Sequence, residues 1–313
     1  MNNVDKVAVC SRSFSVNKTL RSELLAKYKN VTFNDIGESL NGDSLIEFLK
    51  GHSKAITALE TIDDYILSSL PELKVIGKYG VGLDMIDMQS MKRHGKYLGW
   101  TPGVNRRSVA ELALSFALAI THRMIEANNE VLKKNWFQLK GNQLTNKTVG
   151  IIGCGNVGKD FIKLLKPFDC RILVYDIKDY SDFYKEYNVE SLSLEKLLSV
   201  SDIVSLHIPH NKTTSKLISS EKISLMKKGS FLINTARGGI VDEDSLKEAL
   251  KIGHLSGAAF DVFSQEPPTD IDLLNLPNFI ATPHIGGSTV EAILMMGRAA
   301  IEGLESKKIA IEV

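Results

Sequence analysis

The stretch Thr148-Val149-Gly150-Ile151-Ile152-Gly153-Cys154-Gly155-Asn156-Val157-Gly158 decides the fold of this chain. An apolar run leads into three glycines, an amphipathic segment follows to Leu165, and a second apolar run ends at Asp176. A strand, a glycine turn, a helix and a second strand in this order open a dinucleotide-binding unit. The context makes the motif specific, because glycines in this spacing alone are weak support. A glycine-rich turn without a ligand stays the alternative.

Each glycine of the turn has a separate physical task. Gly153 permits the tight turn, Gly155 lets the backbone approach a pyrophosphate at the helix N-terminus, and Gly158 lets the helix pack against the strand. Asn156 and Val157 complete the cofactor-binding turn. The carboxylate of Asp176 would accept hydrogen bonds from the adenosine ribose and repel the 2′-phosphate of NADP. We therefore expect NAD as the cofactor, with nearby Lys178 as the one residue that would soften this preference.

Composition places the chain among ordinary globular proteins. It has 313 residues, 43% hydrophobic and 24% charged, and a formal net charge of +1. This length favours two domains, and the charge gives no basis for binding nucleic acid or a membrane. The N-terminus lacks the pattern of a secretory signal, so we expect a cytoplasmic protein. Three cysteines without metal-ligand spacing predict neither a disulfide nor a metal site.

Alternating strand and helix patterns divide the chain into two α/β domains. In the first, the expected strands lie near residues 7–10, 31–33, 55–58, 75–76 and 98. In the second, six strands are expected near Val149, Ile172, Ile203, Phe231, Ala258 and Phe279. This is a doubly wound parallel-sheet pattern.

Two long helical patterns connect these domains. One starts near Ser108, where Glu111 completes a capping-box signature, and runs toward Asn135. The other covers residues 289–304 and is expected to return to the first domain. We therefore predict one domain from residues 1–100 plus 287–313 and a second from residues 101–286.

Three further segments stand at predicted strand ends, where open parallel sheets bind their ligands. Arg237 follows an apolar strand and offers a two-pronged donor to a carboxylate. Asp261 and Glu266 lie on a proline-stiffened loop, and His284 lies between Pro283 and two glycines. Taken singly, each residue also fits a purely structural role: Arg237 in a surface ion pair, Glu266 as a solvated loop acid, and His284 as a capping or packing histidine. Together they supply a carboxylate clamp, a proton donor and an acid partner for hydride transfer to a 2-keto acid.

These four ordered motifs resemble the D-isomer-specific 2-hydroxyacid dehydrogenases, over about residues 75–303. The resemblance implies two Rossmann-like doubly wound domains: a flavodoxin-like substrate-binding domain, and an NAD-binding domain hinged to it. It also implies a homodimer formed largely by the long helix after the hinge. A corepressor-like protein that senses nicotinamide without catalysis shares this fold and stays an alternative.

The resemblance also implies roles for individual residues. Arg237 would clamp the substrate carboxylate, His284 would protonate the carbonyl oxygen, and Glu266 would hold the imidazole and favour its charged form. Backbone amides of Gly80, Val81 and Gly82 would bind the substrate carboxylate, and Asp261 would face the nicotinamide carboxamide. Further cofactor contacts are expected from His207, Pro209, Thr214, Thr235, Ala236, Arg237, His284, Gly286 and Gly287.

The substrate is less well specified by these motifs. Within the family the chain most resembles the members that oxidise 3-phosphoglycerate, in a form without their regulatory domain. Those members place an arginine and a serine where this chain has Leu59-Glu60-Thr61, and an asparagine where it has Met85. Glu60 would repel a phosphate, although Lys78, Arg106 or Arg107 could compensate. We expect 3-phosphoglycerate first, with glycerate/hydroxypyruvate or glyoxylate as the alternative.

Overall fold

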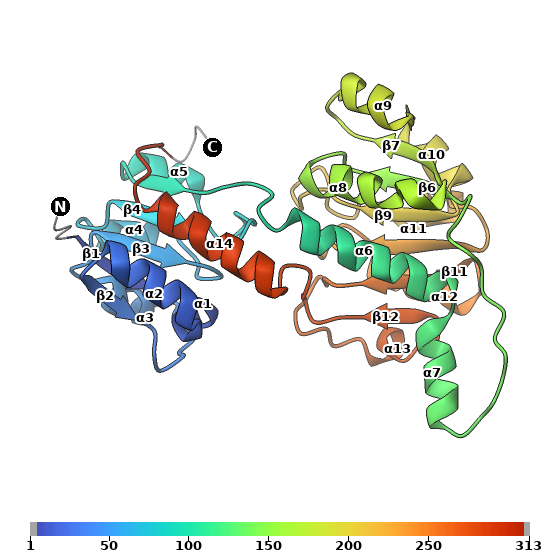
Figure 1. The fold of residues 1–313 in the computed structure, drawn as a ribbon, viewed down its shortest axis with the longest axis horizontal. Helices are drawn as coiled ribbons and strands as arrows, with labels where there is room; N and C mark the ends of the chain where they lie inside the picture. Colours follow the sequence, from blue (N-terminus) through green and yellow to red (C-terminus); the bar gives the residue numbers. More distant parts are fainter. Residues whose placement is uncertain (1–4, 310–313) are drawn as a thin grey trace. The chain divides into compact units, whose positions relative to one another are not determined.

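The computed structural model describes residues 5–309 and divides them into two compact units. Unit 1 contains the described residues up to Asn105 and those from Ser288 onward, and unit 2 is Arg106–Gly287. The boundaries predicted from the sequence, after residues 100 and 286, fall just before the unit boundaries of the structure, which follow Asn105 and Gly287. Each unit is an α/β fold built on one parallel sheet (Figure 1). The predicted fold class is therefore confirmed.

Unit 1 is built on five parallel strands in the order β2-β1-β3-β4-β5. This is the flavodoxin-like order, which reverses direction beside the first strand. The strands are β1 (Lys6–Val9), β2 (Asn30–Phe33), β3 (Lys54–Thr57), β4 (Val75–Lys78) and β5 (Tyr97–Gly99). Helices cover both faces: α3 (Gly42–Leu49), α4 (Asp64–Ser69) and α5 (Met88–Arg93) on one, α1 (Arg12–Val16), α2 (Lys18–Lys27) and α14 (Val290–Gly303) on the other.

The last helix, α14, comes from the far end of the chain and packs against α2, β4 and β5 (Figure 1). Its backbone approaches the sheet closely because glycines face one another. A Cβ atom on Gly99 would lie 2.1–2.3 Å from the backbone of Gly303, and one on Gly77 would lie 2.4 Å from the carbonyl oxygen of Ala300. The C-terminal helix is therefore an integral layer of unit 1.

The Gly99→Ala substitution should destabilise unit 1 by about 3 kcal/mol, because the new methyl group overlaps the α14 backbone. Calorimetry should show an unfolding transition at lower temperature. Glu302→Ala, on the exposed face of the same helix, is the control and should change stability by less than about 0.5 kcal/mol. Equal unfolding temperatures for the two variants would contradict this packing argument.

Unit 2 is built on seven parallel strands in the order β12-β11-β10-β9-β6-β7-β8. Its strands are β6 (Thr148–Ile152), β7 (Arg171–Tyr175), β8 (Val189–Ser191), β9 (Ile203–Leu206), β10 (Ser230–Asn234), β11 (Leu255–Phe260) and β12 (Phe279–Ala281). Six of them were predicted. The prediction missed β8 because it is three residues long and offers one apolar side chain.

Helices cover both faces of the unit 2 sheet. One face carries α6 (Arg106–Thr121), α8 (Asn156–Leu165) and α9 (Ser181–Tyr187), and the other carries α10 (Leu194–Val200), α11 (Ser220–Leu225) and α12 (Glu243–Lys251). The short elements η1 (Lys166–Phe168) and α13 (Ile271–Leu274) fill connections. The carboxyl ends of β6, β9, β10 and β11 consequently share one edge, where the predicted site residues follow.

The long helix predicted from Ser108 to Asn135 is two helices. α6 ends at Thr121, Arg123 adopts the left-handed conformation with φ of 55°, and α7 covers Met124–Leu132. The predicted cap is also wrong, because α6 begins at Arg106 and the Ser108 hydroxyl donates to the carbonyl oxygen of Gly286 at 2.5 Å. Within residues 5–309 no single helix is long and apolar enough to cross a bilayer; only α6 and α7 taken together, bent by 62°, reach that length and composition.

Candidate active site

The glycine turn after β6 has the geometry that a bound dinucleotide requires. Gly153 adopts φ of +99°, and a Cβ there would lie 2.6 Å from the carbonyl oxygen of His207. A Cβ on Gly158 would lie 2.1 Å from the carbonyl oxygen of Gly153, so the start of α8 packs directly against the turn. Gly155, by contrast, faces open space and caps α8 with no side chain. The helix N-terminus is therefore accessible to an anionic ligand.

Asp176 follows β7 beside this turn. Its carboxylate accepts the backbone N–H of Cys154 at 2.6 Å and that of Lys178 at 2.8 Å. These bonds fix the carboxylate next to the glycines, where a ribose diol would meet it. Burial raises the pKa of the Cys154 thiol to about 11, so this cysteine is a neutral packing residue.

His207 follows β9 and packs against the turn. Its Nε2 lies 3.0 Å from the Ser205 hydroxyl, and its Nδ1 is buried with no hydrogen-bond partner in the described chain. Burial lowers the pKa of His207 to about 3, so the imidazole is neutral. Pro209 and Thr214, also predicted here, meet in the next loop, where the Thr214 hydroxyl donates to the Pro209 carbonyl oxygen at 2.7 Å.

Arg237 lies just beyond the carboxyl end of β10 and is half-buried. Its Nη1 donates to the carbonyl oxygen of Ala236 at 2.7 Å, and the side-chain amide of Asn234 donates to the carbonyl oxygen of Arg237 at 2.9 Å. The next residue, Gly238, packs so tightly that a Cβ would lie 1.9 Å from the carbonyl oxygen of Phe263. The strand end and the following loop thereby fix the backbone of Arg237, from which the guanidinium group extends. The hydroxyl of neighbouring Thr235 is buried without a partner in residues 5–309.

Asp261, at the end of β11, is 1% exposed and organises the loop that carries His284. Its Oδ1 accepts the Thr282 hydroxyl and the Ile285 N–H, and its Oδ2 accepts the Gly286 N–H at 2.8 Å. The carbonyl oxygen of Asp261 also accepts the N–H of His284 at 2.9 Å. This shaping role was not predicted. The predicted contact with a nicotinamide carboxamide stays a prediction, as do the contacts of Gly286 and Gly287.

His284 and Glu266 form the pair that the sequence predicted. His284 Nδ1 lies 2.8 Å from Glu266 Oε2, while Glu266 Oε1 accepts the backbone N–H of Phe263 at 3.1 Å. Both side chains are roughly half-exposed. Because Glu266 holds Nδ1, the imidazole presents Nε2 outward. His284 adopts φ of +55°, an uncommon backbone conformation for a residue other than glycine, and the bonds to Asp261 stabilise it.

The predicted carboxylate site of unit 1 is the turn after β4. Gly80 adopts φ of +118°, and the carbonyl oxygen of Val81 accepts the indole N–H of Trp100 at 2.9 Å. The backbone N–H groups of Gly80, Val81 and Gly82 donate to no acceptor in the described part of the chain. Consecutive N–H groups in such a turn suit an anion.

The three cations suggested as phosphate ligands have other partners. Lys78 is buried, and its ammonium group donates to the carbonyl oxygens of Ala58 and Tyr79. Arg107 forms an ion pair with Asp160 of α8, with 3.0 Å between Nη2 and Oδ1. Arg106 also has an interaction partner. The sequence could not reveal the pairings of Lys78 and Arg107, because the first depends on backbone carbonyls and the second on a residue distant in the chain.

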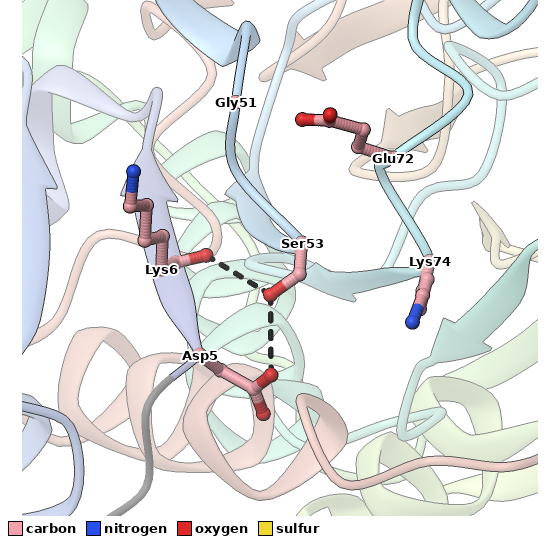
Figure 2. A pocket seen from close by; sticks show the side chains of 6 residues that line it. All are labelled: Asp5, Lys6, Gly51, Ser53, Glu72 and Lys74. Carbon is pink, nitrogen blue, oxygen red and sulfur yellow. Dashed lines mark hydrogen bonds between the residues drawn. The ribbon is translucent and has the colours of Figure 1, made fainter.

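Unit 1 has a hollow of about 360 Å³. There the Ser53 hydroxyl donates to Asp5 and to the carbonyl oxygen of Lys6 (Figure 2). Gly51, Glu72 and Lys74 complete its lining. It lies at the amino ends of β1, β3 and β4, at the opposite end of the unit 1 sheet from the Gly80–Gly82 turn, and holds no predicted site residue. Among the described residues no group of side chains is arranged to hold a metal ion.

Comparison with known proteins identifies the family. Residues 114–286 match the model of the D-isomer specific 2-hydroxyacid dehydrogenase, NAD binding domain. The chain is 41% identical over 253 residues to a glyoxylate reductase of Thermofilum pendens, covering 78% of this chain and 75% of that one. It is 34% identical over 280 residues to a D-3-phosphoglycerate dehydrogenase of Archaeoglobus fulgidus, covering 88% of this chain but 53% of that one. It also resembles the crystal structure of D-lactate dehydrogenase from Aquifex aeolicus complexed with NAD and lactic acid, at a TM-score of 0.84 and 29% identity over 95% and 93% of the two chains.

The chain therefore belongs to the D-isomer-specific 2-hydroxyacid dehydrogenase family. It is an NAD-dependent oxidoreductase, and the predicted cofactor is confirmed. The residues present fit this cofactor: the open turn at Gly155, the fixed carboxylate of Asp176, and the unpartnered buried atoms of His207 and Thr235 all lie at or beside the carboxyl edge of one sheet.

The neutral state of His207 predicts a pH dependence of stability. The unfolded chain takes up a proton near pH 6.5, whereas folded His207 does so only near pH 3. Stability contributed by this residue is thus present above pH 6.5 and is lost as the pH falls, by about 2 kcal/mol between pH 6.5 and 4.5. Chemical denaturation of wild type and His207→Asn should show a shallower pH slope for the variant. Parallel slopes would mean that His207 ionises in the folded state.

Proposed function

We propose that this enzyme reduces small unphosphorylated 2-oxo acids to the corresponding 2-hydroxy acids, with glyoxylate (to glycolate) and hydroxypyruvate (to D-glycerate) as the first candidates. The supporting observation is the charge arrangement after β3. Glu60 is half-buried, and its Oε2 accepts the backbone N–H of Ala58 at 2.5 Å, which fixes a negative charge where phosphate-binding members place a cation. The ammonium group of Lys78 donates to backbone carbonyl oxygens, so it does not offset the charge of Glu60 at the place where a phosphate would bind.

The relationship to known enzymes supports the same choice. The glyoxylate reductase of Thermofilum pendens is matched over most of its own length, whereas the phosphoglycerate dehydrogenase is matched over about half. This reverses the order of substrates expected from the sequence alone, in which 3-phosphoglycerate came first.

The proposed mechanism divides the reaction among the residues of the chain. When bound, NADH supplies the hydride to the carbonyl carbon. Arg237 pairs with the substrate carboxylate and orients the carbonyl group. His284, protonated and held at Nδ1 by Glu266, donates its Nε2 proton to the carbonyl oxygen, which becomes the hydroxyl group. In the reverse direction neutral His284 takes this proton back. Gly80, Val81 and Gly82 keep their predicted role as amide donors to the carboxylate.

The test is NADH oxidation with glyoxylate, hydroxypyruvate and 3-phosphohydroxypyruvate. We expect an unphosphorylated acid to exceed the phosphorylated one at least tenfold in kcat/KM, a difference of about 1.4 kcal/mol in transition-state binding. His284→Ala should lower kcat by about 10²- to 10⁴-fold for every substrate used. Glu60→Arg should raise kcat/KM for the phosphorylated acid selectively. A wild-type preference for 3-phosphohydroxypyruvate would overturn the substrate proposal and favour phosphoglycerate oxidation.

We also propose a homodimer formed through α7 and the segment that follows it. Apolar side chains are unusually exposed there, with Leu132 at 74%, Trp136 at 84% and Phe137 at 64%. A patch of this kind marks an interaction surface, and a second copy of the chain is its proposed occupant because the family resemblance implies a dimer. As part of the same proposal the enzyme works in the cytoplasm, where NADH is available.

Substituting both Trp136 and Phe137 by Ser should convert the dimer to a monomer, measured by light scattering after size-exclusion chromatography. Ile252→Ser removes an equally exposed apolar side chain elsewhere in unit 2 and should leave the mass unchanged. A monomeric wild type, or a double variant that remains dimeric, would contradict this assignment of the surface.

A further inference from the structure

Lys78 is a buried cation directly beneath the turn of Gly80. It is 5% exposed, and its Nζ lies 3.5 Å from the position that a Cβ of Gly80 would occupy. A lysine is almost never fully buried unless its charge has partners. Here the ammonium group donates to the carbonyl oxygen of Ala58 and, at 3.4 Å, to that of Tyr79. The lysine therefore joins the ends of two neighbouring strands, β3 and β4.

The bond to Tyr79 matters because of what lies on the other side of the same peptide group. The carbonyl of Tyr79 and the N–H of Gly80 belong to one amide, and a cation on the oxygen draws electron density away from the nitrogen. Hydrogen bonds in such a chain strengthen one another. The N–H of Gly80 is thus made a stronger donor, and it has no acceptor in residues 5–309.

The surrounding contacts keep this amide in place. The N–H of Tyr79 donates to the carbonyl oxygen of Thr57 at 2.8 Å, and the indole of Trp100 holds the carbonyl oxygen of Val81. Glu60 is the acidic group on the neighbouring loop, and its Oε2 is bonded to the N–H of Ala58. Lys78 and Glu60 consequently hold Ala58 from its two sides, with the cation on the side of the glycine turn.

We propose that Lys78 is a positioning residue for the substrate carboxylate. Its ammonium group polarises the Tyr79–Gly80 peptide and strengthens the Gly80 N–H as a donor to the carboxylate, and it does not bind a substrate phosphate. This inference rests on the proposed function, because it takes the turn as the carboxylate site. In this role the charge of Lys78 acts on the carboxylate site through the peptide backbone, and the lysine does not contact the substrate.

The experiment uses the Tyr79–Gly80 peptide as its own reporter. It is the single Tyr-Gly pair in the sequence, so protein labelled with carbonyl-¹³C tyrosine and ¹⁵N glycine gives one correlation signal from this amide. Lys78→Gln keeps a hydrogen-bond donor and removes the charge. We expect its Gly80 amide proton to move upfield, and its Kd for oxamate, a carboxylate-bearing keto-acid analogue that is not reduced, to rise about tenfold.

Lys74→Gln is the matched control, because it removes one exposed charge just before the same strand and should change neither the signal nor the Kd. Lys78→Met, of nearly the same length, replaces the Gln variant if that variant does not fold. With a reducible substrate, the loss should fall on KM and leave kcat within about threefold.

A Lys78 variant that binds oxamate as wild type does, with an unshifted Gly80 signal and only a lower unfolding temperature, would overturn the proposal and make Lys78 a structural residue. The signal and the oxamate affinity do not depend on turnover. They therefore test Lys78 even if glyoxylate and hydroxypyruvate are not substrates, which would instead overturn the proposed function.

Discussion

The buried carboxylate of Asp261 is the interaction on which the active-site loop of unit 2 depends. It receives two backbone N–H groups and one hydroxyl from the Thr282–Gly286 loop, and its own carbonyl oxygen receives the N–H of His284. A buried carboxylate is costly unless such donors satisfy it, so the loop and the carboxylate stabilise each other. The left-handed backbone of His284 follows from this arrangement, and the imidazole is thereby directed toward Glu266.

Close backbone approach is the second constraint, and it explains where glycine is needed. Gly153 and Gly158 bring a helix onto a strand in unit 2, and Gly99 and Gly303 do the same for α14 in unit 1. Gly155 differs, because nothing lies within 4 Å of its missing Cβ. Packing explains the first four glycines, whereas open space at a helix N-terminus is what a ligand needs.

Much of this organisation could be predicted because it depends on local patterns. Apolar runs located every strand of the two sheets except β8, and the glycine spacing located the turn before α8. Arg237, Glu266 and His284 follow strand ends, so their positions were predictable from the order of motifs. The break at Arg123 was not, because a left-handed residue within an apolar helical pattern leaves no signal in periodicity. The partners of Lys78, Arg107 and Asp261 could not be predicted from the sequence, because they come from tertiary contacts.

Asp261 and Glu266 follow the same strand but do different work, and the difference lies in how many donors each carboxylate already has. Both oxygens of Asp261 are occupied in a site that is 1% exposed, so it has no free position near a reacting proton. Glu266 uses one oxygen for the Phe263 N–H and offers the other to His284 at the half-exposed end of the loop. A carboxylate with one oxygen anchored holds its partner in a single orientation while the partner exchanges a proton. Burial thus makes Asp261 the residue that shapes the loop and leaves Glu266 as the residue that orients the proton donor.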